Sequence, residues 1–398
     1  MKKYIRKFYY WLKNLKYVMP YLRYDKKIPS NGILLITHDF ERQGAPVLLL
    51  NVAKWLNKRG IALTILSTKY GAMMDDFKRY GTVLVEKKKN LPDIFKILYE
   101  QYGYKTAICN TVVTGVYTGH LKKYGYRVVS LIHELGDLIR VGNYGESCNI
   151  ILNNADYIVF PSSYGYKAFT TFLKEECDEN KVVIKNQGLF NVDERDLSKE
   201  QMRTRISKHF NYDFSSKTII LNVATACYRK GFDLFLDLVY SFRNDKQYCF
   251  IWVGDKTSAI LTKKQKEYSL EKFPNLFLPG YITDKDLLND LYGAADLFCL
   301  TSREEPFGSV VLESFKAGVP VLAFDGCGGY MDVVKKNITG YLAPKENVKN
   351  MEQCIRRINF KGKEYLDISS NCLEEVKKHD FNSYCEFLLK MCEVETQS

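Results

Sequence analysis

The chain has 398 residues, of which 46% are hydrophobic and 26% are charged, a balance typical of a globular protein with two or three domains. Its 25 glycines and 10 prolines are too few for a low-complexity or collagen-like chain. The 11 cysteines include no Cys-x-x-Cys pair, so neither a zinc site nor a disulfide framework is predicted. The sequence has no apolar run of bilayer length and no secretory signal, and we therefore expect a cytoplasmic protein.

The positive charge is concentrated near the N-terminus. The formal net charge is +12, and residues 1–30 contribute +8 of it. The remaining chain is only mildly basic, which disfavours a nucleic-acid-binding protein. On a helix, one apolar stripe would hold Tyr4, Phe8, Trp11, Leu12, Leu15, Val18, Met19 and Leu22. We predict that residues 1–30 form a basic amphipathic segment at an anionic membrane surface; the alternative is a helix packed on the domain with solvated lysines.

After residue 31, short β-branched runs alternate with longer helical periods, which is typical of parallel α/β layers. The first half predicts strands at 33–37, 62–67, 82–85, 107–110, 127–133, 157–161 and 182–185. The alternation restarts with strands at 218–223, 249–253, 276–278, 297–300 and 319–323. The pattern predicts two Rossmann-like α/β domains in tandem.

The domain boundaries follow from where the alternation stops. The segment 191–216 is polar and charge-rich and is expected to be a linker with a small helix. We therefore place the first domain at 31–190 and the second at 191–375. Helical spacing continues to the end of the chain with no further strand, so residues 376–398 either cap the second domain or cross back to the first.

The segment 301–320, TSREEPFGSVVLESFKAGVP, is the richest in candidate functional groups. It follows a predicted strand, and a helix that begins near Gly308 would direct its free amides to the C-terminal edge of the sheet, where α/β proteins bind ligands and phosphate. Glu305 precedes this helix and Glu313 lies roughly 7.5 Å further along its axis. One ligand could contact both carboxylates, through a sugar hydroxyl and a ribose; the alternative is that both are surface groups.

The spacing of these two glutamates, the Pro-Phe-Gly after the first and the Glu-Ser-Phe-Lys-Ala-Gly-Val-Pro run resemble the donor-binding signature of the family-four retaining glycosyltransferases, or glycosyl transferases group 1. That family has the GT-B fold, and the resemblance covers residues 33 to about 344. It implies that Glu305 contacts the transferred sugar and that Glu313 binds the nucleotide ribose. The backbone amides that it assigns to sugar and phosphate lie near Phe307, Gly308 and Ser309.

A second matching segment, 222–233, is predicted to run from a strand through a loop into a helix. Lys230 in this loop supplies a point charge suited to a diphosphate, and it would offset the charge that builds on the leaving group. The family usually carries an arginine about five residues before this lysine, but that position is Thr225 here. Arg229 is adjacent and is the candidate replacement.

The first domain offers two further candidates. Gly44 precedes a predicted helix at 45–59 and resembles the family's glycine loop, where a small residue lets the backbone approach a phosphate or an acceptor. His133 ends a predicted strand and resembles the family's histidine at the domain cleft, near the transferred sugar. The alternative for His133 is a structural histidine.

These features predict a retaining glycosyltransferase that moves a sugar from a nucleotide-sugar donor to an acceptor hydroxyl, in cell-surface polysaccharide or glycolipid assembly at the inner face of the membrane. The alternatives are a sugar-nucleotide epimerase or phosphorylase of the same architecture and a non-catalytic nucleotide-sugar binding protein. The sequence has no GxxxxGK[ST] loop, no GxGxxG after the first strand, no HExxH and no Asp-x-Asp at a strand end. We expect no metal, no other cofactor and no nucleic-acid partner.

Overall fold

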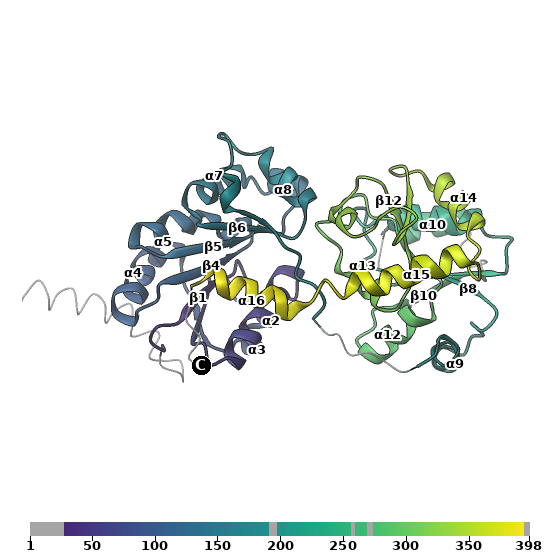
Figure 1. Cartoon of the computed structure of the whole chain (residues 1–398), viewed down its shortest axis with the longest axis horizontal. Helices are drawn as coiled ribbons and strands as arrows, with labels where there is room; N and C mark the ends of the chain where they lie inside the picture. The colour runs from purple at the N-terminus through teal and green to yellow at the C-terminus, as the bar shows by residue number, and fades with distance from the viewer. Residues whose placement is uncertain (1–27, 191–196, 256–258, 269–273, 394–398) are drawn as a thin grey trace, which may run out of the picture. The chain divides into compact units, whose positions relative to one another are not determined.

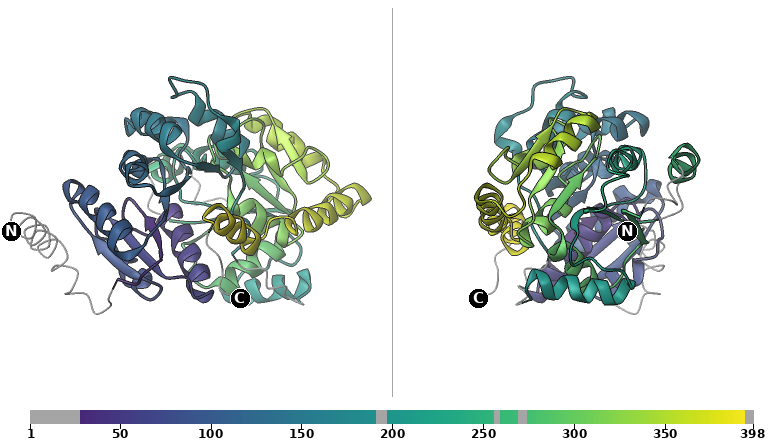
Figure 2. Two further views of the ribbon diagram at one scale, coloured as in Figure 1. Left: turned by 60° about the vertical axis from the view of Figure 1, so that its left-hand side comes forward. Right: turned by 90° about the vertical axis from the view of Figure 1, so that its right-hand side faces the viewer.

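The computed structural model describes residues 28–190, 197–255, 259–268 and 274–393. The predicted basic amphipathic segment lies outside this range, apart from residues 28–30. The described chain divides into two units, coloured by residue number in Figures 1 and 2. Unit 1 holds the residues up to Pro161, Gly165–Lys185 and those from Asn382 onward, and unit 2 holds Ser162–Tyr164 and Asn186–Phe381. These limits differ by a few residues from the boundaries expected from the sequence.

Unit 1 is built on one parallel sheet with the order β3-β2-β1-β4-β5-β6-β7. Its strands are β1 (Ile33–Ile36), β2 (Leu63–Ser67), β3 (Thr82–Val85), β4 (Thr106–Asn110), β5 (Arg127–Leu131), β6 (Tyr157–Phe160) and β7 (Val182–Ile184). All seven predicted strands are confirmed, because both faces of such a sheet are covered and its strands are therefore continuous apolar runs. Its helices are α2 (Gly44–Lys58), α3 (Met74–Lys78), α4 (Leu91–Tyr102), α5 (Thr118–Tyr124), α6 (Gly136–Val141), α7 (Gly145–Asn154) and α8 (Ser163–Thr170).

Unit 2 repeats this architecture with the sheet order β10-β9-β8-β11-β12-β13. Its strands are β8 (Thr218–Val223), β9 (Tyr248–Val253), β10 (Leu276–Gly280), β11 (Leu297–Leu300), β12 (Val321–Phe324) and β13 (Gly340–Ala343). Its helices are α9 (Lys199–Phe210), α10 (Phe232–Ser241), α11 (Ala259–Tyr268), α12 (Lys285–Ala294), α13 (Ser309–Lys316), α14 (Val348–Arg357) and α15 (Lys363–Val376). Strand β13 was not predicted, because its four residues, GYLA, include no β-branched side chain.

The helical pattern at the C-terminus belongs to two helices, which Figures 1 and 2 show in yellow. Helix α15 ends at Val376, and α16 (Phe381–Met391) begins after a short break. Residues from Asn382 onward belong to unit 1, where Trp55 Nε1 donates to Asn382 Oδ1 at 3.1 Å and Thr106 Oγ1 donates to the carbonyl of Cys392 at 3.0 Å. The last helix therefore contacts α2, and the residue that follows it contacts β4.

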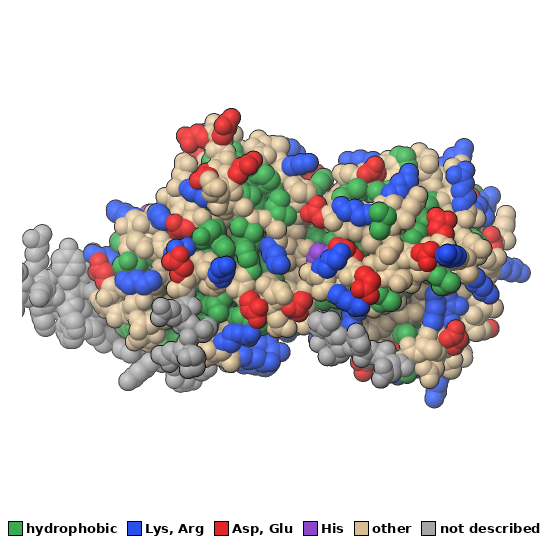
Figure 3. All heavy atoms as spheres, viewed as in Figure 1, with side chains coloured by type: hydrophobic (Ala, Val, Ile, Leu, Met, Phe, Trp, Pro, Cys, Tyr) green, Lys and Arg blue, Asp and Glu red, His purple; other side chains and the backbone are tan. Residues whose placement is uncertain are grey.

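Acidic and basic side chains are interspersed on the face of the described surface drawn in Figure 3. This mixture is ordinary for the solvated surface of a globular domain. Among the described helices, none has the length and apolar character needed to cross a bilayer.

Candidate active site

Both sheets contain a point where the strand order reverses, and in open α/β sheets such a reversal opens a crevice at the C-terminal ends of the strands. The reversal lies between β1 and β4 in unit 1 and between β8 and β11 in unit 2. Ligands of open α/β sheets bind at such crevices. Most site residues predicted from the sequence lie on the loops that follow β1, β8 and β11 or at the start of the next helix. The exceptions are His133, which follows β5, and Glu313, in the second turn of α13.

In unit 2, Lys230 and Glu305 form an ion pair between the loop after β8 and the loop after β11. Both side chains are largely buried, with 17% of Lys230 and 8% of Glu305 exposed. Arg229 Nη1 lies 3.8 Å from Glu305 Oε2, and Ser302 Oγ donates to the same oxygen at 3.4 Å. The sequence suggested separate roles for Lys230 and Glu305, whereas the structure makes them direct partners.

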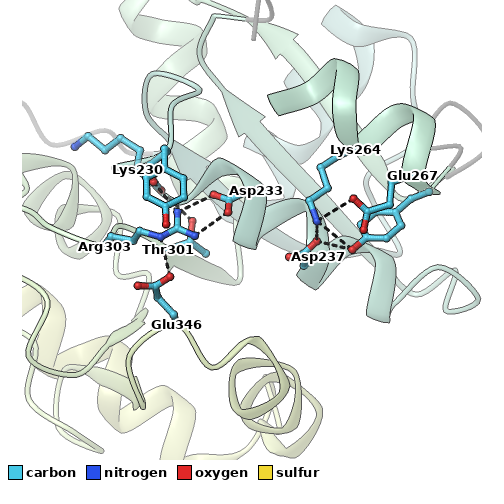
Figure 4. A network of polar contacts seen from close by, with 10 residues as sticks. Lys230, Asp233, Asp237, Lys264, Glu267, Thr301, Arg303 and Glu346 are labelled. Carbon is cyan, nitrogen blue, oxygen red and sulfur yellow. Dashed lines mark hydrogen bonds and ion pairs between the residues drawn. The ribbon is translucent and has the colours of Figure 1, made fainter. Parts of the chain in front are cut away.

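Arg303 connects the loop after β11 to the start of α10 (Figure 4). Its two terminal nitrogens donate to the two carboxylate oxygens of Asp233 at 2.8 and 2.7 Å, and its Nε donates to Glu346 at 2.8 Å. Its guanidinium also lies 3.7 Å from the centre of the Tyr228 ring. Burial opposes ionisation of Asp233, but the hydrogen bonds and charge of Arg303 hold its pKa below the usual value.

Backbone contacts reinforce this connection. The amide of Arg303 donates to the carbonyl of Arg229 at 2.8 Å, and Thr301 Oγ1 donates to the carbonyl of Lys230 at 3.2 Å. Gly231 has a left-handed φ of 66°, and a Cβ there would lie 1.8 Å from the Thr301 carbonyl oxygen. Only glycine fits this close approach. Sequence reasoning missed Arg303, although it lies within the recognised motif.

Helix α13 begins at Ser309, close to the predicted start. Gly308 precedes it with a left-handed φ of 81°, and no side chain from the described residues caps this end. The first amides of a helix have no partner within it, so they can bind an anion. Phe307 is only 4% exposed and belongs to the core, which leaves its backbone as the group available to a ligand.

Glu313 is half-buried in the second turn of α13. Its Oε2 accepts a hydrogen bond of 2.7 Å from the Tyr292 hydroxyl, and burial raises its pKa. The structure therefore contradicts the alternative that Glu313 is an exposed surface group. Tyr292 was not predicted as a site residue, because its partner is 21 positions away in the sequence.

In unit 1, His133 lies two residues beyond the end of β5. Its Nε2 is 3.1 Å from Asn110 Oδ1, and Asn110 Nδ2 donates to the carbonyl of Ala45 at 3.0 Å. Burial, with a smaller contribution from the charge of His38, lowers the pKa of His133 to about 4. His133 is therefore neutral at physiological pH. The sequence suggested His133 but gave no signal for Asn110.

Glu134 and Thr111, which lie beyond the ends of β5 and β4, are held by the structure around them. The buried carboxylate of Glu134 accepts from the amides of Val112 at 2.9 Å and His133 at 3.2 Å, and burial raises its pKa. Thr111 has a φ of 87°, which is an outlier for a β-branched residue. Backbone strain of this kind persists where the surrounding structure enforces it, often at functional sites.

Gly44 is the exposed first residue of α2, and a Cβ at this position would meet no atom within 4 Å. The protein's own packing therefore does not require glycine here.

The candidates gathered in unit 2 are Arg229, Lys230, Glu305, Phe307, Gly308, Ser309 and Glu313. Gly44 and His133 belong to unit 1, where Asn110 links His133 to Ala45, the residue after Gly44. Among the described residues, no group of three or more His, Cys, Asp or Glu side chains is arranged to hold a metal ion.

Residues 205–372 match the family "Glycosyl transferases group 1". The match lies within the second domain and covers less than half of the chain. Among similar proteins, the mannosylfructose-phosphate synthase of Agrobacterium fabrum is 30% identical over 135 residues, which cover 32% of this chain and 28% of that protein. The processive diacylglycerol alpha-glucosyltransferase of Acholeplasma laidlawii is 27% identical over 173 residues, which cover 43% and 48%. The chain thus spans less than half the length of these two relatives.

The fold of most of the chain resembles those of solved structures of other proteins. Anabaena Alr3699/HepE in complex with UDP has a TM-score of 0.76 at 17% identity, and the match covers 90% of this chain and 98% of that one. A glycosyltransferase from Rickettsia africae has a TM-score of 0.73 at 17% identity, with coverage of 92% and 98%. The chain has the GT-B fold, as its group 1 motif implied.

Proposed function

We propose that the chain transfers a sugar from a nucleotide-diphosphate sugar to an acceptor hydroxyl, with retention of the anomeric configuration. The ion pair of Lys230 with Glu305 beside the N-terminus of α13, within the group 1 domain, carries this proposal. It combines a cation and free amides suited to a diphosphate with a carboxylate suited to a sugar hydroxyl. Further support comes from Anabaena HepE, whose structures contain UDP, UDP with glucose, and UDP-glucose.

The proposed reaction uses these groups in distinct roles. Departure of the sugar builds negative charge on the diphosphate, which Lys230 and the first amides of α13 stabilise. Glu305 accepts hydrogen bonds from sugar hydroxyls, and Glu313, oriented by Tyr292, accepts from the ribose. The acceptor hydroxyl attacks the face from which the diphosphate leaves. We propose that neither a metal nor another cofactor takes part.

Two relatives support alpha-linked transfer and a glycolipid acceptor. Their names are processive diacylglycerol alpha-glucosyltransferase and, from Streptococcus pneumoniae, alpha-galactosylglucosyldiacylglycerol synthase. A third similar protein, from Klebsiella pneumoniae, is an uncharacterized 41.2 kDa protein in the cps region. An alpha product formed from an alpha nucleotide sugar means retention, and we propose an acceptor in cell-surface polysaccharide or glycolipid assembly.

A thermal-shift screen of nucleotides and nucleotide sugars tests the donor site, because a ligand that binds only the folded state raises the apparent stability. The matched donor is then incubated with candidate glycan and lipid acceptors, with and without EDTA. We expect sugar transfer that EDTA does not abolish. Donor turnover without an acceptor would instead indicate an epimerase or phosphorylase, and binding without turnover would indicate a binding protein.

Glu313→Gln is expected to weaken binding of the nucleotide sugar and of the bare nucleoside diphosphate alike, because both carry the ribose. A hydrogen bond to a charged group contributes about 1.5 to 3 kcal/mol, or roughly a 10- to 150-fold change in Kd. Isothermal titration calorimetry with both ligands measures the change. Glu364→Gln, at the start of α15 and outside the proposed site, is the control and should leave both affinities unchanged. A selective loss for the nucleotide sugar alone would contradict the ribose assignment.

Removal of residues 1–27 is expected to leave a folded, donor-binding protein that no longer sediments with anionic liposomes. This expectation rests on the sequence, because each basic residue near such a surface contributes about 1 kcal/mol. Co-sedimentation with phosphatidylserine vesicles, beside neutral vesicles as the control, measures it. Equal sedimentation of the full-length and shortened chains would contradict the proposed peripheral membrane association.

A further inference from the structure

The environment of His133 determines which nitrogen of its imidazole carries the proton. Asn110 is fully buried at the end of β4, beside the reversal in strand order of unit 1. Its side chain lies between the carbonyl of Ala45, at 3.0 Å, and His133 Nε2, at 3.1 Å. The two contacts come from α2 and from the loop after β5, so three segments meet at this one amide.

The chemistry of these contacts fixes every hydrogen in the chain of bonds. A backbone carbonyl can only accept, so the Asn110 NH₂ group must face Ala45. The Asn110 oxygen then faces His133, and because it can only accept, Nε2 must carry the proton. The part-buried imidazole is neutral, because its pKa is lowered to about 4, so its Nδ1 is left unprotonated with a lone pair. No hydrogen bond joins this Nδ1 to the described part of the chain.

We propose that Asn110 is a positioning residue that holds His133 as the Nε2–H tautomer and leaves Nδ1 to accept a hydrogen bond from a substrate hydroxyl. This inference rests on the proposed sugar transfer, which supplies ligands rich in hydroxyl groups. It assigns His133 the role of a hydrogen-bond acceptor and excludes the roles of acid and cation. Asn110 acts through His133 and does not itself contact the substrate.

The charged and titratable groups near His133 come from several neighbouring elements. Glu134, on the same loop, has its carboxylate bonded to backbone amides, including that of His133 itself. After β1 lie His38 and Asp39, whose Nε2 and Oδ2 are 3.3 Å apart, and Lys69 after β2 acts on His38. At the end of β4, Asn110 and Thr111 are neutral. Among the described residues, Asn110 is the group that hydrogen-bonds to the His133 ring.

Nitrogen NMR of the full-length chain labelled with ¹⁵N-histidine reads the tautomer without any ligand. The chain has five histidines, and the signals lost in His133→Gln identify this one. In the wild type we expect a protonated Nε2 and an unprotonated Nδ1, with no titration between about pH 8 and pH 6. Protonation at Nδ1 instead of Nε2 would overturn the proposal.

Asn110→Asp keeps an acceptor for Nε2–H but adds a negative charge. A carboxylate at this distance raises the pKa of a histidine by about 1 to 3 units, so the His133 signals should titrate near pH 5 to 7. Once protonated, Nδ1 donates instead of accepting. Turnover of the variant, relative to the wild-type profile, should therefore fall about 2-fold at the pH where half of His133 is protonated and about 10-fold one pH unit below it.

Asn51→Asp is the matched control, since it adds the same charge on α2, where the Asn51 amide donates to Val47 of its own helix and to no other described residue. Neither the His133 signals nor the pH profile should change in it. If Asn110→Asp protonates His133 at about pH 6 without loss of turnover, the acceptor role is wrong. Loss of the other four histidine signals would show that the variant does not fold. In that case the tautomer measured in the wild type tests the proposal by itself. Because the NMR measurement needs no substrate, failure of the proposed sugar transfer would be seen separately, as absence of wild-type turnover.

Discussion

Lys230→Ala is expected to lower turnover by about 100- to 1,000-fold, because loss of one preorganised charged contact to a developing anion costs about 2.7 to 4 kcal/mol. Donor affinity should fall much less. The diphosphate gains charge as the sugar bond breaks, and only the part of an interaction that strengthens in the transition state accelerates the reaction. Steady-state kinetics with the donor and acceptor found by the screen separates the two effects. Near-wild-type turnover would remove Lys230 from the proposed site.

The ion pair makes a further prediction about Lys230 and Glu305 together. Glu305→Gln should reduce turnover while leaving binding of the bare nucleoside diphosphate intact, since its proposed partner is the sugar. Because the two side chains are in contact, their effects should not be additive in the double variant. A double variant whose loss equals the product of the two single losses would show that the groups act independently.

Arg229→Ala tests whether Arg229 replaces the arginine that the family usually carries at the position of Thr225. Its side chain is 48% exposed, and its Nη1 donates to the carbonyl of Glu304 at 3.0 Å as well as lying near Glu305. A loss of turnover similar to that of Lys230→Ala would show that Arg229 supplies a second charge. Unchanged turnover would show that Lys230 and the amides of α13 act without it.

Asp233→Asn is expected to destabilise unit 2 and to slow turnover, although Asp233 contacts no substrate in the proposed reaction. The variant loses charge-assisted hydrogen bonds to Arg303, each worth about 1.5 to 3 kcal/mol, with the lower value expected for this partly exposed pair. Without them, Arg303 holds the loops that carry Lys230 and Glu305 less firmly. Denaturant unfolding measures the stability, and kinetics at a temperature where the variant is folded measures the turnover.

Asp237→Asn is the matched control for Asp233→Asn. Both aspartates lie on α10 and pair with a cation, since Asp237 accepts from Lys264 at 2.5 Å (Figure 4). We expect Asp237→Asn to lower stability but not turnover of the folded protein. Equal losses of turnover in both variants would show that Asp233 has no specific effect on the site.

The lowered pKa of Asp233 also sets a pH dependence. A carboxylate with a depressed pKa in the folded state stabilises the protein above its ordinary pKa, which is 3.8 for aspartate, and loses this effect as the pH falls through the lowered value. The difference in stability between the wild type and Asp233→Asn should therefore be full at neutral pH and shrink below about pH 4. A difference that persists unchanged in acid would mean that the ionised carboxylate is not its source.

The strand pattern could be read from the sequence because strands of a covered parallel sheet are apolar on both faces. Runs such as ILLI in β1 and YCFIWV in β9 are fully buried and interrupted by helices of clear period. The pattern failed for β13, which has no β-branched residue. At the C-terminus it left open whether residues 376–398 cap the second domain or cross back to the first, and the residues from Asn382 onward lie in unit 1. In both cases the structure depends on packing against other elements, and the local sequence does not reveal that packing.

The sequence by itself determined which side chains are present near each strand end and which family motif they form. It therefore supplied Lys230, Glu305, Glu313 and His133 as candidates. Only the tertiary structure decided what these groups contact: Glu305 meets Lys230 across 75 positions, Arg303 meets Asp233 across 70, and His133 meets Asn110 across 23. Such partners are brought together by the order of strands in the sheet. A residue's charge and hydrogen-bonding capacity are local properties, but its partner depends on the path of the whole chain.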